Sequence, residues 1–292
     1  MTPSGLLLLD KSAGWTSHDV VAKLRGVLGT RRVGHAGTLD PMATGLLVIG
    51  VNAGTKLLTY LVGADKTYEA TIRLGQATNT DDAEGQPVGE SVDATHLETR
   101  ELQSAIERLT GEIMQVPSSV SAIKVDGKRA YALVRSGEEV KLQPRPVRVA
   151  EFRVIGAPRR TEEGFVDIDA VITCSSGTYI RALARDLGAA LKVGGHLTAL
   201  RRTRVGKYSV DDATTIEKAS PEALLPLASA ATEAFAVRML TDAEVTDLRH
   251  GKRLDAVGIV GDHCGIDEHG ELVAMLLESG KQCRSTVVFA SV

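Results

Sequence analysis

Asp40 is the carboxylate whose surroundings most favour chemistry. It lies in the glycine-rich segment GHAGTLDPMATGLL, residues 34–47, and it is the only acidic residue between Asp19 and Asp65. Pro41 biases Asp40 toward an extended conformation, and the glycines allow another chain to approach closely. A carboxylate in a positive field stays ionised, so it can act as a nucleophile or stabilise a cation. The alternative is a structural Asp that closes a turn before proline.

Four other side chains are candidates for the same site. Arg181 follows a strand-to-helix junction, where it suits a carboxylate partner, although the spacing alone favours a solvated Arg in the first turn of the helix. Tyr68 and Tyr179 could stack on a base or belong to the core. His35 has little bulk beside it, so it could wedge into a nucleic acid or bond to the backbone.

The charge pattern favours a polyanion as partner. The net charge is −3, yet the stretch between Asp186 and Asp211 contains basic residues and no acidic one. A basic face on a weakly acidic protein is typical of nucleic-acid binders, although solvated loops give the same pattern. The basic residues are Lys192, Arg201, Arg202, Arg204 and Lys207 in this stretch, and Lys124, Lys128, Arg129, Arg135, Lys141, Arg145 and Arg148 in another.

The sequence contains none of the common motifs for metal or cofactor binding. The sequence contains no GxxxxGK[ST], GxGxxG, HExxH or GxSxG, and its seven His are scattered. Its three Cys form no CxxC pair, which favours reduced thiols in a cytoplasmic protein and argues against a zinc site. We also expect no signal peptide and no membrane span, because no apolar run approaches about 20 residues. We therefore expect an enzyme without cofactor or metal.

The elements that must position these residues mix strands and helices without a regular alternation. Hydrophobic periodicity predicts strands near residues 6–10, 45–51, 68–74, 147–155 and 166–175, and helices near 18–28, 97–109 and 178–191. Residues 34–45 and the acidic segment 78–89 are expected to be loops. This order favours an α+β fold with a mixed or antiparallel sheet.

Two domains are expected. Residues 1–230 form the larger domain, with an insertion at about 117–147 that contains a short helix near 129–136. Residues 221–236, rich in Ala and Pro, are the best candidate for a linker. Residues 236–292 read as a small β-rich domain with strands near 258–260, 272–277 and 286–290.

Five motifs in this order resemble the TruB-type tRNA pseudouridine synthases over most of residues 5–210. The motifs are LDKSAGWTS at 9–17, GHAGTLDPMATGLL at 34–47, KTYEA at 66–70, CSSGTYIRALARDLG at 174–188 and HLTALRRTRVG at 196–206. The first motif departs from the family pattern, because Ser12 stands where a proline is usual. The region after about residue 235 is only weakly similar to the family's PUA-like RNA-binding domain.

The resemblance implies a pseudouridine-synthase catalytic fold and a reaction. Uridine at position 55 in the T loop of tRNA would be flipped out and isomerised to pseudouridine. The N1–C1′ bond breaks and C5 rejoins the ribose, so no atoms are gained and no cofactor is needed. Asp40 would be the nucleophile, either at the ribose or at the ring.

The resemblance also implies roles for the other candidates. Arg181 would pair with Asp40, and Tyr68 would stack on the uracil and assist proton removal. His35 would fill the space that the base leaves, while Tyr179 and Leu200 would line the uracil pocket. Phosphates would be held by the two basic stretches, including Arg201, Arg202, Arg204 and Lys207.

Two other functions fit the charge pattern. One is an RNA-binding or tRNA-folding module without chemistry, which gives no reason for Asp40 together with Arg181. The other is a subunit of a guide-RNA-dependent pseudouridine synthase, which shares the motifs. The main expectation is a cytoplasmic monomer that binds the tRNA T-arm and has no obligate protein partner.

Overall fold

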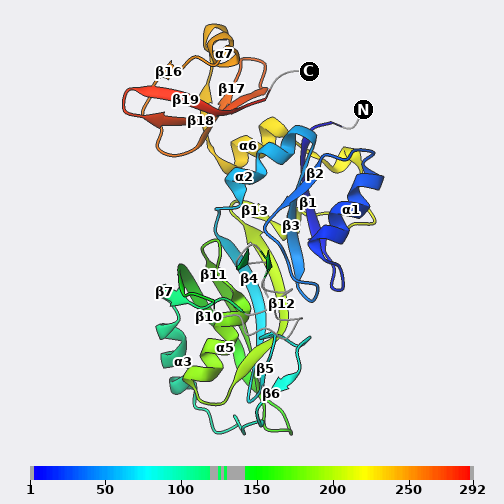
Figure 1. Ribbon diagram of the computed structural model, residues 1–292, viewed down its shortest axis with the longest axis vertical. Coiled ribbons are helices and arrows are strands. Elements are labelled where there is room, and N and C mark those ends of the chain that lie inside the picture. Colours follow the sequence, from blue (N-terminus) through cyan, green and yellow to red (C-terminus); the bar gives the residue numbers. More distant parts are fainter. Residues whose placement is uncertain (1–2, 119–123, 126–127, 130–141, 290–292) are drawn as a thin grey trace. The chain divides into compact units, whose positions relative to one another are not determined.

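The chain folds into two units, as shown by a computed structural model that describes residues 3–118, 124–125, 128–129 and 142–289 (Figure 1). The first unit comprises Met1–Pro41, Gly45–Ala64 and Arg204–Val292. The second comprises Met42–Thr44 and Asp65–Thr203. Helices combine with largely antiparallel strands, which confirms the expected α+β class.

The N-terminal part of the first unit is built on a buried apolar strand. β1 (Gly5–Lys11) lies antiparallel between β3 (Thr44–Val51) and β14 (Leu225–Pro226), and β2 (Val33–Ala36) pairs with β3. Helix α1 (Ser17–Val27) begins after Thr16, whose hydroxyl accepts a hydrogen bond from the Asp19 amide. This cap and the apolar spacing explain why the predicted helix forms here.

The remainder of the first unit carries a separate five-stranded sheet in the order β15-β17-β18-β19-β16. Its strands are β15 (Ala236–Met239), β16 (Leu254–Asp255), β17 (His263–Ile266), β18 (Leu272–Ser279) and β19 (Gln282–Val288). The other elements of the unit are η1 (Asn52–Lys56), α2 (Leu58–Leu61), β13 (Tyr208–Ser209), η2 (Val210–Asp212), η3 (Pro221–Ala223), α6 (Leu227–Ala234) and α7 (Asp242–Arg249).

The second unit is a sheet in the order β12-β4-β11-β10-β7, with helices α3 and α5 in contact (Figure 1). The elements are β4 (Lys66–Leu74), β5 (Ala77–Thr78), β6 (Pro87–Val88), α3 (Thr99–Arg108), β7 (Gly111–Gln115), β8 (Lys124–Val125), β9 (Lys128–Arg129), β10 (Arg145–Arg160), β11 (Val166–Cys174), α5 (Ile180–Ala190) and β12 (Gly195–Val205). Alternate residues of β4 and β11 are buried, as the period of a strand requires.

Three local expectations are wrong. Residues 221–236 are not a linker, because α6 buries Ala230 and Ala231 and the Tyr208 hydroxyl donates to the Ala230 carbonyl at 2.6 Å. Part of the expected loop 34–45 belongs to β2, which exists through its pairing with β3. Residues 258–260 are not a strand. The expected helix near 129–136 lies outside the described residues, apart from Arg129 in β9.

In the described part of the chain, no helix is both long enough and apolar enough to cross a membrane.

A buried lysine lies at the start of β4. Lys66 is 6 % exposed and is on the same face of the strand as Tyr68. Burial, together with the positive charge of Arg202, lowers the pKa of Lys66 to about 8. The fold therefore holds this ammonium at a cost in stability at neutral pH.

The pH dependence of stability tests this cost. Between pH 8 and 10.5 the unfolded chain keeps the Lys66 proton that the folded chain has lost, so the free energy of unfolding rises with pH. We expect the free energy of unfolding of wild type minus that of Lys66→Met to rise by roughly 3 kcal/mol across this range in urea unfolding. Lys23→Met, at an exposed position of α1, is the matched control. Parallel pH curves for wild type and Lys66→Met would contradict the prediction.

Candidate active site

The half-buried Asp40 lies in the loop between β2 and β3. Both the amide and the carbonyl of the preceding residue, Leu39, form hydrogen bonds. The Ser17 hydroxyl donates to the Leu39 carbonyl at 3.1 Å and accepts from the Leu39 amide at 2.9 Å. Ser17 is fully buried, so water does not compete for these bonds. The first turn of α1 thus fixes the chain that leads into Asp40.

The residue after Asp40 is held by a buried ammonium. Lys11 is 1 % exposed and its Nζ donates to the carbonyls of Trp15 at 2.7 Å, Ser12 at 3.1 Å and Pro41 at 3.3 Å. The Gly14 amide donates to the same Pro41 carbonyl at 2.9 Å. The motif at residues 9–17 therefore clamps the loop on both sides of the candidate carboxylate.

His35 lies in β2, opposite Ile49 of β3. Its ring is 5.8 Å from the His18 ring in an edge-to-face arrangement. The half-buried imidazole is therefore held by strand pairing and by a neighbouring ring, in the stretch of chain that precedes Asp40.

Arg181 is oriented by a buried ion pair that the sequence analysis missed. It lies in the first turn of α5 and is 5 % exposed. Its Nη1 donates to the Asp82 carboxylate at 3.2 Å and to the Thr80 carbonyl at 3.0 Å. Asp82 is 3 % exposed and also accepts from the Glu84 amide. These contacts fix the guanidinium in position.

A second ion pair lies one helical turn further along α5. Arg185 Nη1 is 3.2 Å from the Asp81 carboxylate, and its Nη2 donates to the Val116 carbonyl at 2.7 Å. Asp81 has φ 61°, a left-handed conformation that Asp tolerates better than most residues. Two adjacent carboxylates thereby meet two arginines on one face of the helix.

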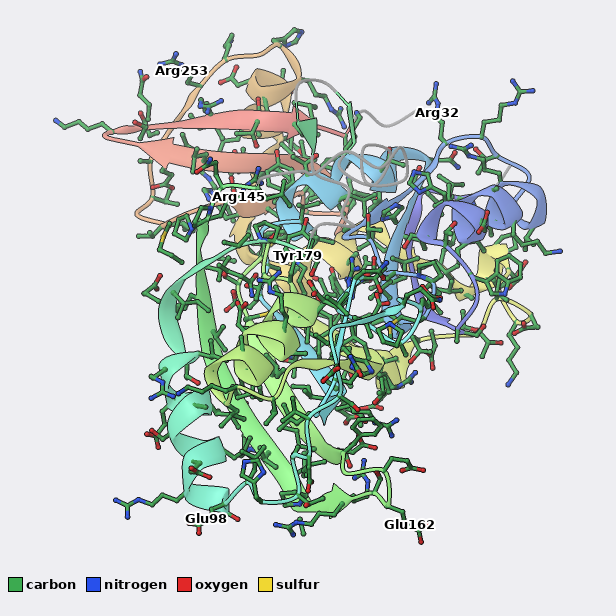
Figure 2. All side chains as sticks on the ribbon, turned by 60° about the horizontal axis from the view of Figure 1, so that its bottom comes forward. Arg32, Glu98, Arg145, Glu162, Tyr179 and Arg253 are labelled. Atoms are coloured by element: carbon green, nitrogen blue, oxygen red, sulfur yellow. The ribbon has the colours of Figure 1, made fainter. Side chains whose placement is uncertain are left out.

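Tyr179 is the N-cap residue of α5 and is held by Gln115 of β7. The Tyr179 amide donates to Gln115 Oε1 at 2.8 Å, and Gln115 Nε2 donates to the Tyr179 carbonyl at 3.1 Å. Figure 2 shows Tyr179 and Arg145 toward one end of the second unit and Glu98 and Glu162 toward the other.

Tyr68 and Leu200 are both buried, at 8 % exposure each. Tyr68 projects from β4, and Leu200 lies in β12, the neighbouring strand. The Leu200 carbonyl accepts from the Thr44 hydroxyl at 3.5 Å. An aromatic ring and an aliphatic side chain are thus available on adjacent strands.

The basic residues of β12 differ in exposure, which corrects one expectation. Arg202 is 1 % exposed, so its guanidinium does not reach the surface where a phosphate contact was expected. Arg201 and Arg204 are half-buried, and Arg204 donates to the Gly206 carbonyl. Lys207 is exposed in the turn between β12 and β13.

The other basic stretch is only partly described. Arg145 and Arg148 are exposed on β10. The paired strands β8 and β9 contain Lys124, Lys128 and Arg129. Arg135 and Lys141 lie outside the described residues.

The residues that sequence reasoning missed are mainly those that position the candidates. Lys11 and Ser17 belong to a recognised motif, but their contacts to the Asp40 loop are not visible in the sequence. Asp82 was hidden in a segment expected to be an acidic loop. Within the described residues, the one cluster of His, Cys, Asp or Glu close enough to hold a metal ion contains none of these site residues.

Family models match nearly the whole chain. Residues 25–180 match the model described as "TruB family pseudouridylate synthase (N terminal domain)". Residues 181–234 match "tRNA pseudouridylate synthase B C-terminal domain", and residues 235–290 match "tRNA Pseudouridine synthase II, C terminal".

Relatives and solved structures agree with these matches. Proteins named tRNA pseudouridine synthase B from Rhodococcus jostii and Mycobacterium tuberculosis are each 54 % identical over 98 % of this chain, covering 93 % and 96 % of the relatives. A structure titled "Crystal Structure of a Cbf5-Nop10-Gar1 Complex" has a TM-score of 0.73 at 25 % identity, covering 98 % of this chain and 85 % of that one. With matching family models over most of its length and relatives of this identity, the chain belongs to the TruB family of pseudouridylate synthases, a family of isomerases.

Proposed function

We propose that this pseudouridine synthase isomerises the uridine at position 55 in the T loop of tRNA. The observation that carries the proposal is the Asp40 loop, whose backbone is bonded on both sides by the buried Ser17 and Lys11. A nucleophile held in this way needs little reorganisation to reach the transition state. The relatives' shared name, tRNA pseudouridine synthase B, supports tRNA as the substrate.

The proposed reaction balances within the nucleotide. Asp40 attacks either C1′ of the ribose or the uracil ring, and the N1–C1′ bond breaks. A new bond joins C1′ to C5, and the bond to Asp40 breaks and frees its carboxylate. The C5 proton leaves, and N1 gains a proton. The product has the mass of the substrate.

The other site residues would bind and orient the flipped uridine. We assign stacking on the uracil to Tyr68 and the walls of its pocket to Tyr179 and Leu200. His35 would fill the space in the RNA that the base leaves. Arg181, oriented by Asp82, would support the charge of Asp40.

We also propose an oligomeric state, a cellular compartment and a role for each domain. All assigned residues come from one chain, so we propose a monomer without an obligate protein partner. Cys174, Cys264 and Cys283 are free and buried, which suits a reducing cytoplasm. We propose residues 1–230 as the catalytic domain, with an insertion at about 117–147, and residues 236–292 as a PUA-like RNA-binding domain that contacts tRNA away from the T loop.

Asp40→Asn tests the nucleophile. The amide keeps the size of the side chain and removes its negative charge, so tRNA binding should persist while pseudouridine formation falls by several orders of magnitude. Conversion of a T-arm hairpin by the purified protein alone, followed by nucleoside analysis, measures the rate. A variant with a tenth of the wild-type rate would refute the role, and a requirement for an added guide RNA would instead favour a guide-dependent subunit.

Ser17→Ala tests the clamp on the Asp40 loop. Losing both bonds to Leu39 leaves two buried polar groups unpaired, so we expect a fall in kcat of roughly tenfold to a hundredfold with little change in tRNA affinity. Thr16→Ala is the matched control, because it removes the helix cap one residue away and should lower stability by about 1 kcal/mol without this loss of kcat. Equal kcat effects from the two changes would mean that α1 stability, and not the loop, is responsible.

The salt dependence of tRNA binding tests the basic surface. Replacing Arg201 and Lys207 together by Ala should weaken binding and reduce the slope of log K against log salt by roughly 0.7 to 0.9 for each lost phosphate contact. Arg100→Ala, on α3 among acidic residues, should leave the slope unchanged. If the double variant keeps the wild-type slope, these side chains are solvated and do not contact RNA.

A further inference from the structure

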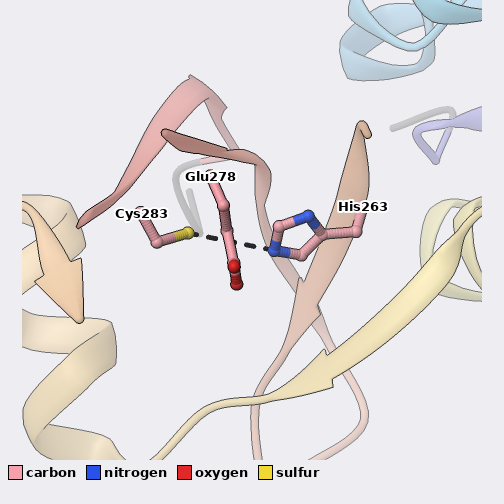
Figure 3. Close-up of side chains that lie close together, drawn as sticks. All are labelled: His263, Glu278 and Cys283. Carbon is pink, nitrogen blue, oxygen red and sulfur yellow. Dashed lines mark hydrogen bonds between the residues drawn. The ribbon is translucent and has the colours of Figure 1, made fainter. Parts of the chain in front are cut away.

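Three strands of the C-terminal sheet bring together three different metal-binding side chains. His263 of β17, Glu278 of β18 and Cys283 of β19 have ligand atoms within 4.8 Å of one another (Figure 3). His263 and Cys283 are fully buried, while Glu278 is half-buried and opens the cluster toward solvent. The proposed catalytic chemistry uses none of the three.

The His263 ring directs the lone pair of Nε2 toward the Cys283 thiol of this cluster. Its Nδ1 is 3.1 Å from the Gly261 carbonyl, which can only accept a hydrogen bond. Nδ1 therefore carries the proton, and Nε2 has its lone pair directed toward Cys283, whose Sγ is 3.8 Å away. A backbone carbonyl on the far nitrogen is the usual way in which a metal-binding histidine is oriented.

The Glu278 carboxylate is also held in place. One oxygen accepts from the Val257 amide at 2.9 Å and the other from the Gly258 amide at 2.8 Å. These bonds lower the pKa of the Glu278 carboxyl, so it is ionised at neutral pH. Each oxygen retains a further lone pair that can bind a cation.

The charges near the cluster suit a divalent cation. Arg238 lies close to Cys283, but its guanidinium is already paired with Glu244 at 2.6 Å. The Glu278 carboxylate adds a negative charge beside His263 and Cys283 that this pair does not neutralise. Burial raises the pKa of the Cys283 thiol, so a metal ion would have to displace that proton.

We propose that His263 Nε2, Glu278 and Cys283 Sγ bind one Zn²⁺ ion, with water as the fourth ligand. Zinc bonds of about 2.0 to 2.3 Å place tetrahedral ligand atoms about 3.3 to 3.8 Å apart, which the His263–Cys283 distance already matches. The Glu278 ligand atom, which lies within 4.8 Å of the other two, would move toward the ion to complete the site. On binding, a zinc–sulfur bond forms as the S–H bond breaks, and the proton passes to solvent. The ion would join β17, β18 and β19.

Titration of the full-length, chelator-treated protein tests this site. Co²⁺ should produce a sulfur-to-metal charge-transfer band and the visible bands of a tetrahedral ion, saturating at about one ion per chain. Zn²⁺ should then abolish the spectrum by displacement and raise the melting temperature of the protein. Wild-type protein that shows no charge-transfer band would overturn the proposal without any variant.

Variants identify the ligands. Cys283→Ser and His263→Gln should each lose the band and the rise in melting temperature. Cys264→Ser is the matched control, because Cys264 is also a fully buried thiol of β17, and it should keep both. If Cys283→Ser keeps the charge-transfer band, Cys283 is not a ligand and the proposal is wrong. Loss of the band in Cys264→Ser in that case would make Cys264 the ligand. Pseudouridine formation should be unaffected by chelation, which separates this site from the proposed function.

Discussion

Hydrogen bonds from buried side chains to the backbone around Asp40 are the constraint on which the candidate site depends. A loop rich in glycine has many accessible conformations, and a nucleophile on such a loop is poorly placed unless the loop is restrained. Ser17 binds the backbone of the residue before Asp40, and Lys11 binds the carbonyl of the residue after it. Because both side chains are buried, water does not compete for their hydrogen bonds. Breaking one of these bonds leaves a buried polar group with neither a protein partner nor water.

Hydrogen bonds from side chains also hold candidate site residues in the second unit. Gln115 brackets the backbone of Tyr179, and Asp82 with the Thr80 carbonyl orients Arg181. In each case a side chain distant in sequence fixes a residue that the proposed reaction uses. Positioning and chemistry are thus assigned to different residues, and a change in a positioning residue should alter rate more than binding.

Buried cations are a further feature of this fold. Lys11, Lys66, Arg181 and Arg202 are each at most 6 % exposed. Lys11 and Arg181 are compensated by carbonyls and a carboxylate, whereas the lowered pKa of Lys66 shows that its charge is held at a cost. The Lys66 charge lies on the same face of β4 as Tyr68, the face that the proposed substrate would meet.

Sequence alone determined the fold class, most of the long helices and strands, and the identity of the candidate residues. Helix α1 and strand β4 follow from a cap and from apolar periodicity, which are local properties, and the five ordered motifs identify the family. The sequence could not show that Asp82 meets Arg181, that Arg202 is buried, or that part of residues 221–236 forms the packed helix α6, because these depend on which distant segments pair. The tertiary structure alone brings His263, Glu278 and Cys283 together: their spacing along the chain forms no metal motif, and only the registers of three antiparallel strands place them side by side.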